Sequence, residues 1–221
     1  MVIQPKYSGA AEGAIASYDW TDIASRTGKE VYYIATGLNG ATTNYNLTNF
    51  KVFSHSIKLS QAYNSAGTAF ELDIEKDFDL EFGQPRNIKG DFFGNLMIST
   101  ADTGGSYGTS VKTTTKLRKW DGTTETEILS IDAEGGGAGA GATVSTIFGI
   151  SGTFPLTHFK AGETLRITIM IYTKSTSGTA STTDGNIYLG SDPNNRTDAL
   201  FATTGHNRTD TQFVIPFRID I

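Results

Sequence analysis

The sequence has no cysteine among its 221 residues. Disulfide bridges, thiolate nucleophiles and cysteine-ligated zinc sites are therefore excluded. Charged residues make up only 19% of the chain and the net charge is -5, so the basic face that nucleic-acid binding needs is missing. No run approaches the roughly 20 apolar residues of a membrane span, and the first residues lack the pattern of a signal peptide. We expect neither nucleic acid nor membrane as a partner.

The residues that are abundant favour β-structure. Thirteen Phe and nine Tyr can supply a core, and Ser, Thr, Asn and 25 Gly suit turns and exposed strand faces. Helical periodicity is absent over any window longer than a turn or two. Strand-like runs recur about eight to ten times at the spacing of β-sandwiches. We therefore expect an extended N-terminal arm over residues 1–13 and a single β-sandwich domain over residues 14–221.

The clearest strand signal lies in residues 153–172. Four apolar residues of one parity lie there: Leu165, Ile167, Ile169 and Ile171. They alternate with Arg166, Thr168, Met170 and Tyr172. This period of two predicts a strand with one buried face, entered through a turn at residues 160–163.

Local signals predict several further elements. Asp121-Gly122 stands between two strand-like runs and predicts a hairpin. Residues 134–142, EGGGAGAGA, predict a loop within one domain or a linker. Gly90 and Gly94 predict interruptions of the strand in residues 88–100. The last run alternates from Phe213 to Ile221, and Pro216 predicts an edge strand or a bulge there.

A row of six acids is the strongest candidate for enzymatic chemistry. It comprises Glu71, Asp73, Glu75, Asp77, Asp79 and Glu81. A glycosidase needs two carboxylates about 5 to 9 Å apart, which this row could supply. Calcium prefers oxygen ligands, so the same row could also bind calcium, and so could Asp192, Asn194 and Asp198. A row of acids is, however, expected on any solvent face whose opposite face is core. We favour that surface interpretation and expect a bend near Lys76, which breaks the apolar parity.

The other candidate residues are dispersed. His55, His158 and His206 show no metal-ligand spacing, so we predict no metal, cofactor or catalytic set. The basic residues Lys112, Lys116, Arg118 and Lys119 indicate a solvated edge strand, or else a contact with an acidic partner. Six aromatic residues near loops or strand ends form a possible sugar-binding platform: Tyr32, Tyr33, Tyr45, Tyr63, Tyr107 and Trp120.

The N-terminal arm, the turn and strand FKAGETLRITIMI, the glycine-rich loop and the terminal QFVIPFRIDI together resemble structural proteins of tailed bacteriophages. They are similar to jelly-roll decoration (cement) proteins, which bind and stabilise assembled capsids, often as trimers. The resemblance implies a jelly-roll-like antiparallel sandwich that forms a homotrimer. It also implies the major capsid protein as partner and a place on the virion surface after synthesis in the host cytoplasm. It transfers no functional residue.

An arm that cannot fold alone suggests folding against a partner. We therefore predict partner contacts at Val2, Ile3, Pro5 and Tyr7. The first alternative is a carbohydrate- or receptor-binding head of a phage tail fibre, with a glycan as partner. The second is a glycoside-acting enzyme, which requires two acids converging in a cleft.

Overall fold

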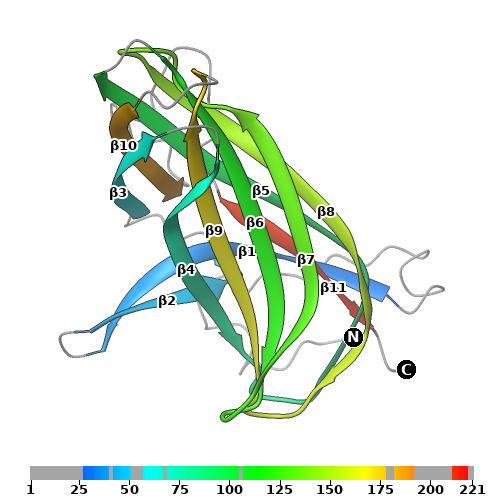
Figure 1. Cartoon of the computed structure of the whole chain (residues 1–221). Helices are drawn as coiled ribbons and strands as arrows, with labels where there is room; N and C mark the ends of the chain where they lie inside the picture. The colour runs from blue at the N-terminus through cyan, green and yellow to red at the C-terminus, as the bar shows by residue number, and fades with distance from the viewer. Residues whose placement is uncertain are drawn as a thin grey trace.

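The computed structural model describes residues 27–39, 42–50, 57–66, 69–104, 107–177, 182–191 and 211–218, and every element in these ranges is a strand (Figure 1). In chain order the strands are β1 (Thr27–Asn39), β2 (Thr42–Thr48), β3 (Ile57–Ala66), β4 (Glu71–Glu81), β5 (Arg86–Gly104), β6 (Thr109–Trp120), β7 (Glu125–Gly136), β8 (Thr143–Phe159), β9 (Thr164–Ser175), β10 (Thr182–Ser191) and β11 (Gln212–Arg218). None of the described residues forms a helix with the length and hydropathy that a membrane crossing requires.

Eight of the strands pair in a nested order. β3 pairs with β10, β4 with β9, β5 with β8 and β6 with β7, all antiparallel. β10 then pairs with β5, and β9 pairs with β6. The result is two four-stranded sheets, β3-β10-β5-β8 and β4-β9-β6-β7, which is the jelly-roll arrangement. The predicted all-β, jelly-roll-like antiparallel sandwich is confirmed, with eleven strands where we expected eight to ten. The predicted arm, residues 1–13, lies outside the described residues, and the division into domains stays a prediction.

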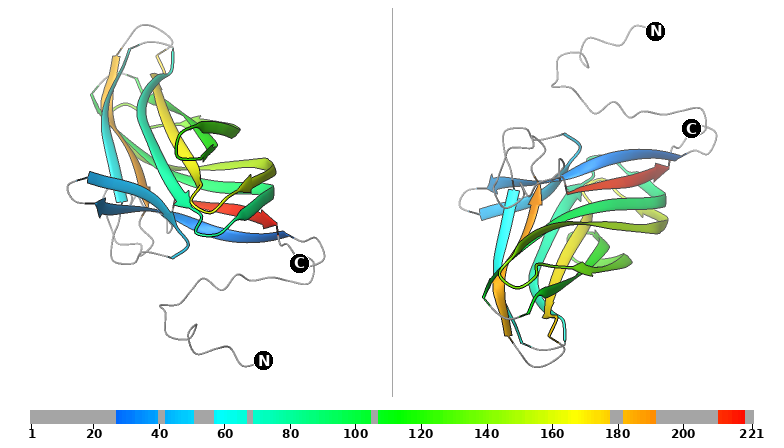
Figure 2. Two further views of the ribbon diagram at one scale, coloured as in Figure 1. Left: turned by 90° about the horizontal axis from the view of Figure 1, so that it is seen from below. Right: turned by 90° about the horizontal axis from the view of Figure 1, so that it is seen from above.

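The remaining three strands form a strip, β11-β1-β2, that joins the two sheets (Figure 2). β11 pairs with the first half of β5, up to Asn95, while β10 pairs with its second half from Met97. At the other side of the strip, β2 meets β4 through a single parallel pair, Asn46 with Asp79. In Figure 1 β1 and β2 run across the direction of β9 and β6. The strip therefore bridges the two sheets at one end of the jelly roll.

Phenylalanine dominates the interior between the sheets. Five Phe side chains are fully buried: Phe78, Phe92, Phe154, Phe159 and Phe213. The rings of Phe92 and Phe213 stack with centroids 5.9 Å apart, which ties β5 to β11. Phe82 and Phe159 meet at 5.0 Å, which ties the end of β4 to the end of β8. Burying one such side chain stabilises the fold by about 1.5–3 kcal/mol.

The strand and turn predicted in residues 153–172 are confirmed as the end of β8, a turn and β9. The four alternating apolar side chains of β9 are completely buried. Gly162 has a φ of 84°, a left-handed conformation that favours glycine. The Glu163 carboxylate accepts hydrogen bonds from Lys119 Nζ (2.6 Å) and the Lys160 backbone N–H (2.7 Å). These bonds, that of Lys119 first, hold the pKa of Glu163 below its ordinary value.

The predicted hairpin at Asp121-Gly122 is also confirmed, between β6 and β7. Gly122 has a φ of 97°. Asp121 Oδ1 accepts hydrogen bonds from the backbone N–H groups of Thr123 (2.9 Å) and Thr124 (2.7 Å). These bonds, that of Thr124 first, lower the pKa of Asp121. Because the aspartate side chain itself closes the turn, the two residues Asp121-Gly122 were sufficient to predict the hairpin from the sequence.

Pro216 marks a bulge, and the alternative prediction of an edge strand is wrong. β11 lies between β1 and β5, and its register with β5 shifts between Val214 and Phe217. Proline has no N–H to donate, and it therefore lies where the hydrogen-bond ladder between β11 and β5 is interrupted. Opposite it Gly90 has a φ of 125°, and a Cβ at Gly90 would lie 3.3 Å from Pro216 Cβ. The residues beyond 218, including Ile219 and Ile221, lie outside the described part.

The predicted interruption of the strand at Gly94 is wrong, because β5 continues through it to Gly104. A Cβ at Gly94 would come within 2.8 Å of Phe213 and 2.9 Å of Ile150. Glycine therefore makes room for two core side chains without ending the strand. Gly90 does mark an irregularity, since the register with β8 shifts between Ile88 and Gly90.

The glycine-rich segment 134–142 is a packed connection between β7 and β8. Thr100 Oγ1 accepts a hydrogen bond from Ala138 N–H (2.7 Å), and Ala138 is 1% exposed. The Thr109 N–H donates to Ala138 O and the Gly137 N–H donates to Thr109 O, both at 2.8 Å. A Cβ at Gly137 would lie 2.7 Å from Thr109 O. Glycine serves here for close backbone approach.

Gly137→Ala should therefore destabilise the protein by about 1–3 kcal/mol, since a side chain would force the two backbones apart. Gly139→Ala is the matched control, because a Cβ there meets nothing within 4 Å; its effect should stay within about 0.5 kcal/mol. Urea-induced unfolding of both variants measures the difference. Equal stabilities would contradict the packed connection.

Candidate functional site

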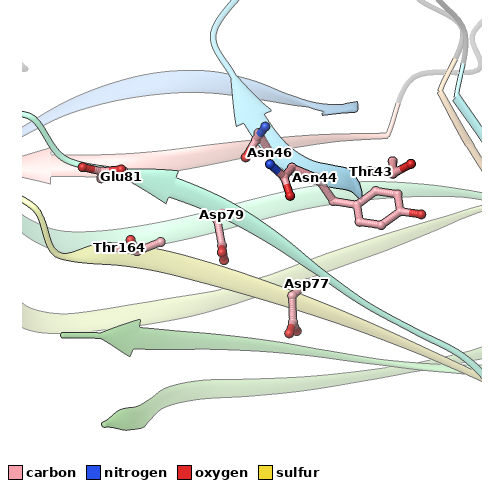
Figure 3. A pocket seen from close by; sticks show the side chains of 8 residues that line it. Thr43, Asn44, Asn46, Asp77, Asp79, Glu81 and Thr164 are labelled. Atoms are coloured by element: carbon pink, nitrogen blue, oxygen red, sulfur yellow. The ribbon is translucent and has the colours of Figure 1, made fainter. Parts of the chain in front are cut away.

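A polar cavity opens where β2 and β4 separate beyond their single paired position. Its volume is about 410 Å³. Its walls are residues 43–46 of β2, three acids of β4 and Thr164 of β9 (Figure 3). The three acids are Asp77, Asp79 and Glu81. Amide, hydroxyl and carboxylate groups therefore meet in one place, and half of the predicted acid row lies there.

Two of these acids are already held by β9. Arg166 donates from Nε to Asp79 Oδ1 and from Nη2 to Asp79 Oδ2, both at 2.8 Å. The Thr168 hydroxyl donates to Asp77 Oδ1 at 2.6 Å. Bidentate pairing of this kind fixes the geometry of both partners. Because both oxygens of Asp79 accept from a guanidinium, its carboxylate is occupied and poorly suited to act as a general acid or base.

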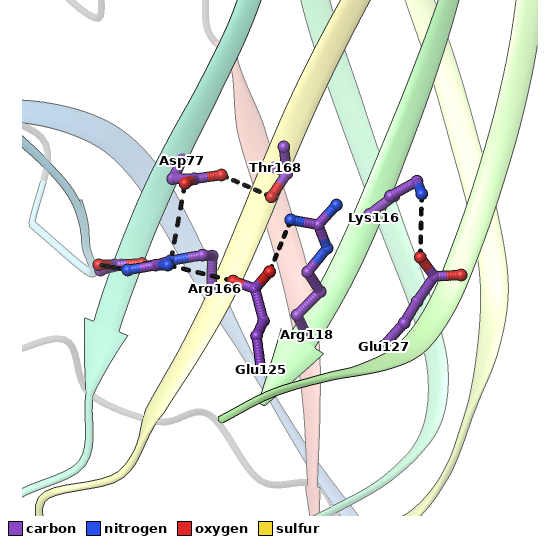
Figure 4. Close-up of polar contacts among 8 residues, drawn as sticks. Asp77, Lys116, Arg118, Glu125, Glu127, Arg166 and Thr168 are labelled. Carbon is purple, nitrogen blue, oxygen red and sulfur yellow. Dashed lines mark hydrogen bonds and ion pairs between the residues drawn. The ribbon is translucent and has the colours of Figure 1, made fainter. Parts of the chain in front are cut away.

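Arg166 also connects the cavity to the neighbouring strands (Figure 4). Its Nη1 donates to Glu125 Oε1 at 3.1 Å, and Arg118 Nη1 donates to Glu125 Oε2 at 2.9 Å. The Trp120 ring lies 5.5 Å from the guanidinium carbon, within cation–π range. The hydrogen bonds to Asp79, more than any other contact, raise the pKa of Arg166 above its ordinary value. The result is one connected charge network across β4, β9, β6 and β7.

The basic residues of β6 belong to the same outer face, and the prediction of a solvated edge strand is wrong. β6 lies between β9 and β7. Three of these basic side chains form ion pairs with acids of β7: Lys112–Asp132 (3.0 Å), Lys116–Glu127 (3.1 Å) and Arg118–Glu125 (2.9 Å). The alternative, a contact with an acidic partner, stays a prediction. Hydrogen bonds from Thr114 and then from Lys112 lower the pKa of Asp132.

The rest of the acid row divides between solvent and interior. Glu71 and Glu75 are exposed, as the surface interpretation expected, and so is Glu81 at the rim of the cavity. Asp73 lies at a register shift between β4 and β9, which is the irregularity predicted near Lys76. Its Oδ2 is buried and has no hydrogen-bond partner within the described structure. Burial raises the pKa of this carboxyl.

Many of the other predicted site residues cannot be placed. Val2, Ile3, Pro5 and Tyr7 lie outside the described residues. So do two histidines and one acidic turn: His55, His206, Asp192, Asn194 and Asp198. His158 Nδ1 lies 2.8 Å from Asn87 Oδ1, an ordinary cross-strand hydrogen bond. Within the described ranges no group of three or more His, Asp or Glu residues could hold a metal ion.

The proposed aromatic platform does not form a single surface. Tyr32 and Tyr63 are core residues, 7% and 3% exposed. The Tyr63 hydroxyl lies 2.8 Å from Thr109 Oγ1, a hydrogen bond between the two sheets. Of the six aromatic residues, Tyr107 is among the large side chains that remain exposed. Aromatic stacking is therefore a weak basis for sugar binding here.

Sequence reasoning did not locate an apolar row on the outer face of the other sheet. Val31 of β1 pairs with Val214 of β11, which pairs with Phe93 of β5. Val31 is 37% exposed and Phe93 43% exposed, while their neighbours Tyr32 and Phe92 face the core. The sequence does contain a signal for this row, because these strands carry apolar residues at both odd and even positions. A sandwich strand with one buried face needs them at only one parity.

No protein-family model and no curated protein sequence matches this chain. Among solved structures, it is similar to a CocE/NonD family hydrolase from Staphylococcus aureus at 14% identity and a TM-score of 0.50, over 87% of this chain and 37% of the hydrolase chain. This likeness concerns the fold alone.

Two further likenesses are looser. The chain is similar to infectious bursal disease virus VP2 at 12% identity and a TM-score of 0.33, over 86% of this chain and 43% of that chain. It is also similar to Eiger TNF from S. frugiperda at 7% identity and a TM-score of 0.24, over 74% and 93%. At these TM-scores the likenesses support no inference. The chain spans well under half the length of the hydrolase and the VP2 chain.

Arg166→Met should destabilise the protein by about 1–3 kcal/mol, because it leaves Asp77, Asp79 and Glu125 close together without their shared cation. Lys116→Met is the matched control, since it removes a single, more exposed pair with Glu127, worth about 0–1 kcal/mol. Thermal unfolding at neutral pH measures both. A smaller effect of the Arg166 substitution than of the control would contradict the network.

Proposed function

We propose that this chain is a non-enzymatic structural protein of a virion, most simply a capsid decoration protein that assembles as a homotrimer on the shell. The observation that supports the proposal is the apolar row of Val31, Val214 and Phe93, in which Val31 and Phe93 are exposed and Val214 is half-buried. Contiguous apolar side chains on a flat sheet face are typical of protein–protein contacts. The jelly roll is a fold that capsid proteins use, although a fold alone does not determine function.

The cavity is consistent with a non-enzymatic role. A glycosidase needs two carboxylates that can exchange protons with a substrate. Asp79 is held at both oxygens by Arg166, and Asp77 accepts from Thr168. These bonds engage both acids with β9, which supports a structural role for them.

Light scattering on the purified chain tests the assembly. The proposal expects a mass of three times the 23.7 kDa monomer, and a fraction that sediments with assembled phage capsids. A monomer at all concentrations that does not sediment with capsids would contradict it. Phe93→Ser should weaken the assembly, whereas Ser130→Ala on the exposed face of β7 is the control and should not.

A second candidate function, a carbohydrate-binding head of a tail fibre, is favoured by the cavity of about 410 Å³. Asn44, Asn46 and Thr43 present amides and a hydroxyl, which are groups that hydrogen-bond sugars. A glycan array with the wild type and Asn44→Ala distinguishes the two. Binding that disappears in the variant, from a chain that does not sediment with capsids, would favour the fibre head over the decoration protein.

A further inference from the structure

The outer apolar face, defined as Val31, Val214, Phe93 and Ile147, extends over four neighbouring strands. Val31, Val214 and Phe93 stand in one row across β1, β11 and β5, and the row ends at Ser151 of β8. Ile147 lies four residues further along β8 and is 47% exposed. None of these side chains belongs to the buried core cluster, and Val31, Phe93 and Ile147 are exposed, so these three are available for a partner.

Charged groups flank this face on one side only. The next row runs through Tyr33, Gln212, Asn95 and Gly149 and carries no ionic group. The row on the other side holds Lys29, whose Nζ lies 5.3 Å from the Phe93 ring, and Asp91, an exposed acid two residues before Phe93 on β5. The outer face of β4-β9-β6-β7, in contrast, is crossed by ion pairs. A partner for the apolar face is therefore selected by shape and apolar contact, with little contribution from charge.

A segment of this chain matches those requirements. Residues 1–26 precede β1, and Ile3, Pro5 and Tyr7 alternate there with Gln4 and Lys6. When such a segment is extended, its three apolar side chains share one side. Ile3 and Tyr7 are four residues apart, which is about 13 Å in an extended chain. Ile147 is also four residues along β8 from Ser151, where the Phe93 row ends, so the two separations match.

The geometry of the strip favours a neighbouring molecule as the donor. β1 begins at Thr27, only four residues before Val31. A chain's own segment would have to turn back over β1 to reach its own face, whereas the segment of a neighbour can approach directly. Twenty-six extended residues reach on the order of 80 Å, which is ample between adjoining subunits.

We propose that the outer apolar face binds the N-terminal segment of a second copy of this chain, through Ile3, Pro5 and Tyr7. The inference rests on the proposed homo-oligomer. It adds the receiving surface and the direction of exchange: an arm from one subunit lies on β11, β5 and β8 of the next. Each subunit then contributes one arm and one face, a head-to-tail contact that gives a closed ring when the rotation between subunits closes.

The absence of cysteine makes this directly testable in the full chain. Ile3→Cys and Phe93→Cys are placed on separately tagged chains, mixed and oxidised, and Tyr7→Cys with Ile147→Cys forms a second pair. Hetero-crosslinks should exceed those of the control pair, Ile3→Cys with Ser130→Cys on β7, by about tenfold or more, because a docked arm raises the local thiol concentration. Phe93 and Ile147 are both exposed, so their substitution should leave thermal unfolding unchanged, which verifies that the variants fold.

The outcomes separate this inference from the proposed function. An oligomeric wild type that gives no crosslinks above the control overturns arm exchange and leaves the assembly standing. A wild type that is monomeric overturns both. Crosslinks that form within one chain, in the double variant Ile3→Cys/Phe93→Cys at high dilution, overturn the second copy as the donor. Deletion of residues 1–13 that abolishes the oligomer, together with crosslinks above the control in the full chain, supports the inference.

Discussion

The length of β5 is the constraint on which the described structure depends. One edge of its 19 residues pairs with β8, and the other edge is shared between β11 and β10. Without the first half of β5, the strip β11-β1-β2 would lose its pairing with the sheet β3-β10-β5-β8. Without the second half, β10 and β3 would be lost from the jelly roll. Gly90 and Gly94 permit this length by accommodating Pro216 and Phe213.

The two outer faces of the sandwich have opposite chemistry. On β4-β9-β6-β7, arginine and lysine side chains are paired with acids of neighbouring strands, so charge is largely satisfied within the chain. Isolated surface pairs contribute little, but a connected set with bidentate geometry contributes more. On β1-β11-β5-β8, apolar side chains remain in solvent. A molecule that satisfies its charges internally and leaves apolar groups exposed is suited to assembly on one side only.

The sequence predicted those elements whose signals are local. Alternation from Leu165 to Ile171 identified β9, and Asp121-Gly122 identified a hairpin whose aspartate closes its own turn. Predictions failed where the deciding contact is distant: β6 was expected at an edge because its partner β9 is some fifty residues away in the chain. Gly94 was interpreted as a break because nothing in the sequence places Phe213 beside it. The cavity also required the topology, since β2 meets β4 through a single pair.

The pairing of β1 with β11 has a mechanical consequence. The ladder places Thr27 opposite Arg218, so the two ends of the described chain leave from the same end of one strand pair. A force applied through both ends would open the ladder one residue pair at a time, like a zipper, instead of shearing all seven pairs together. The strip would therefore yield first under tension, while the nested strands of the jelly roll stay intact. If the protein were attached through only one of its two ends, no force would act across the β1–β11 ladder in this way.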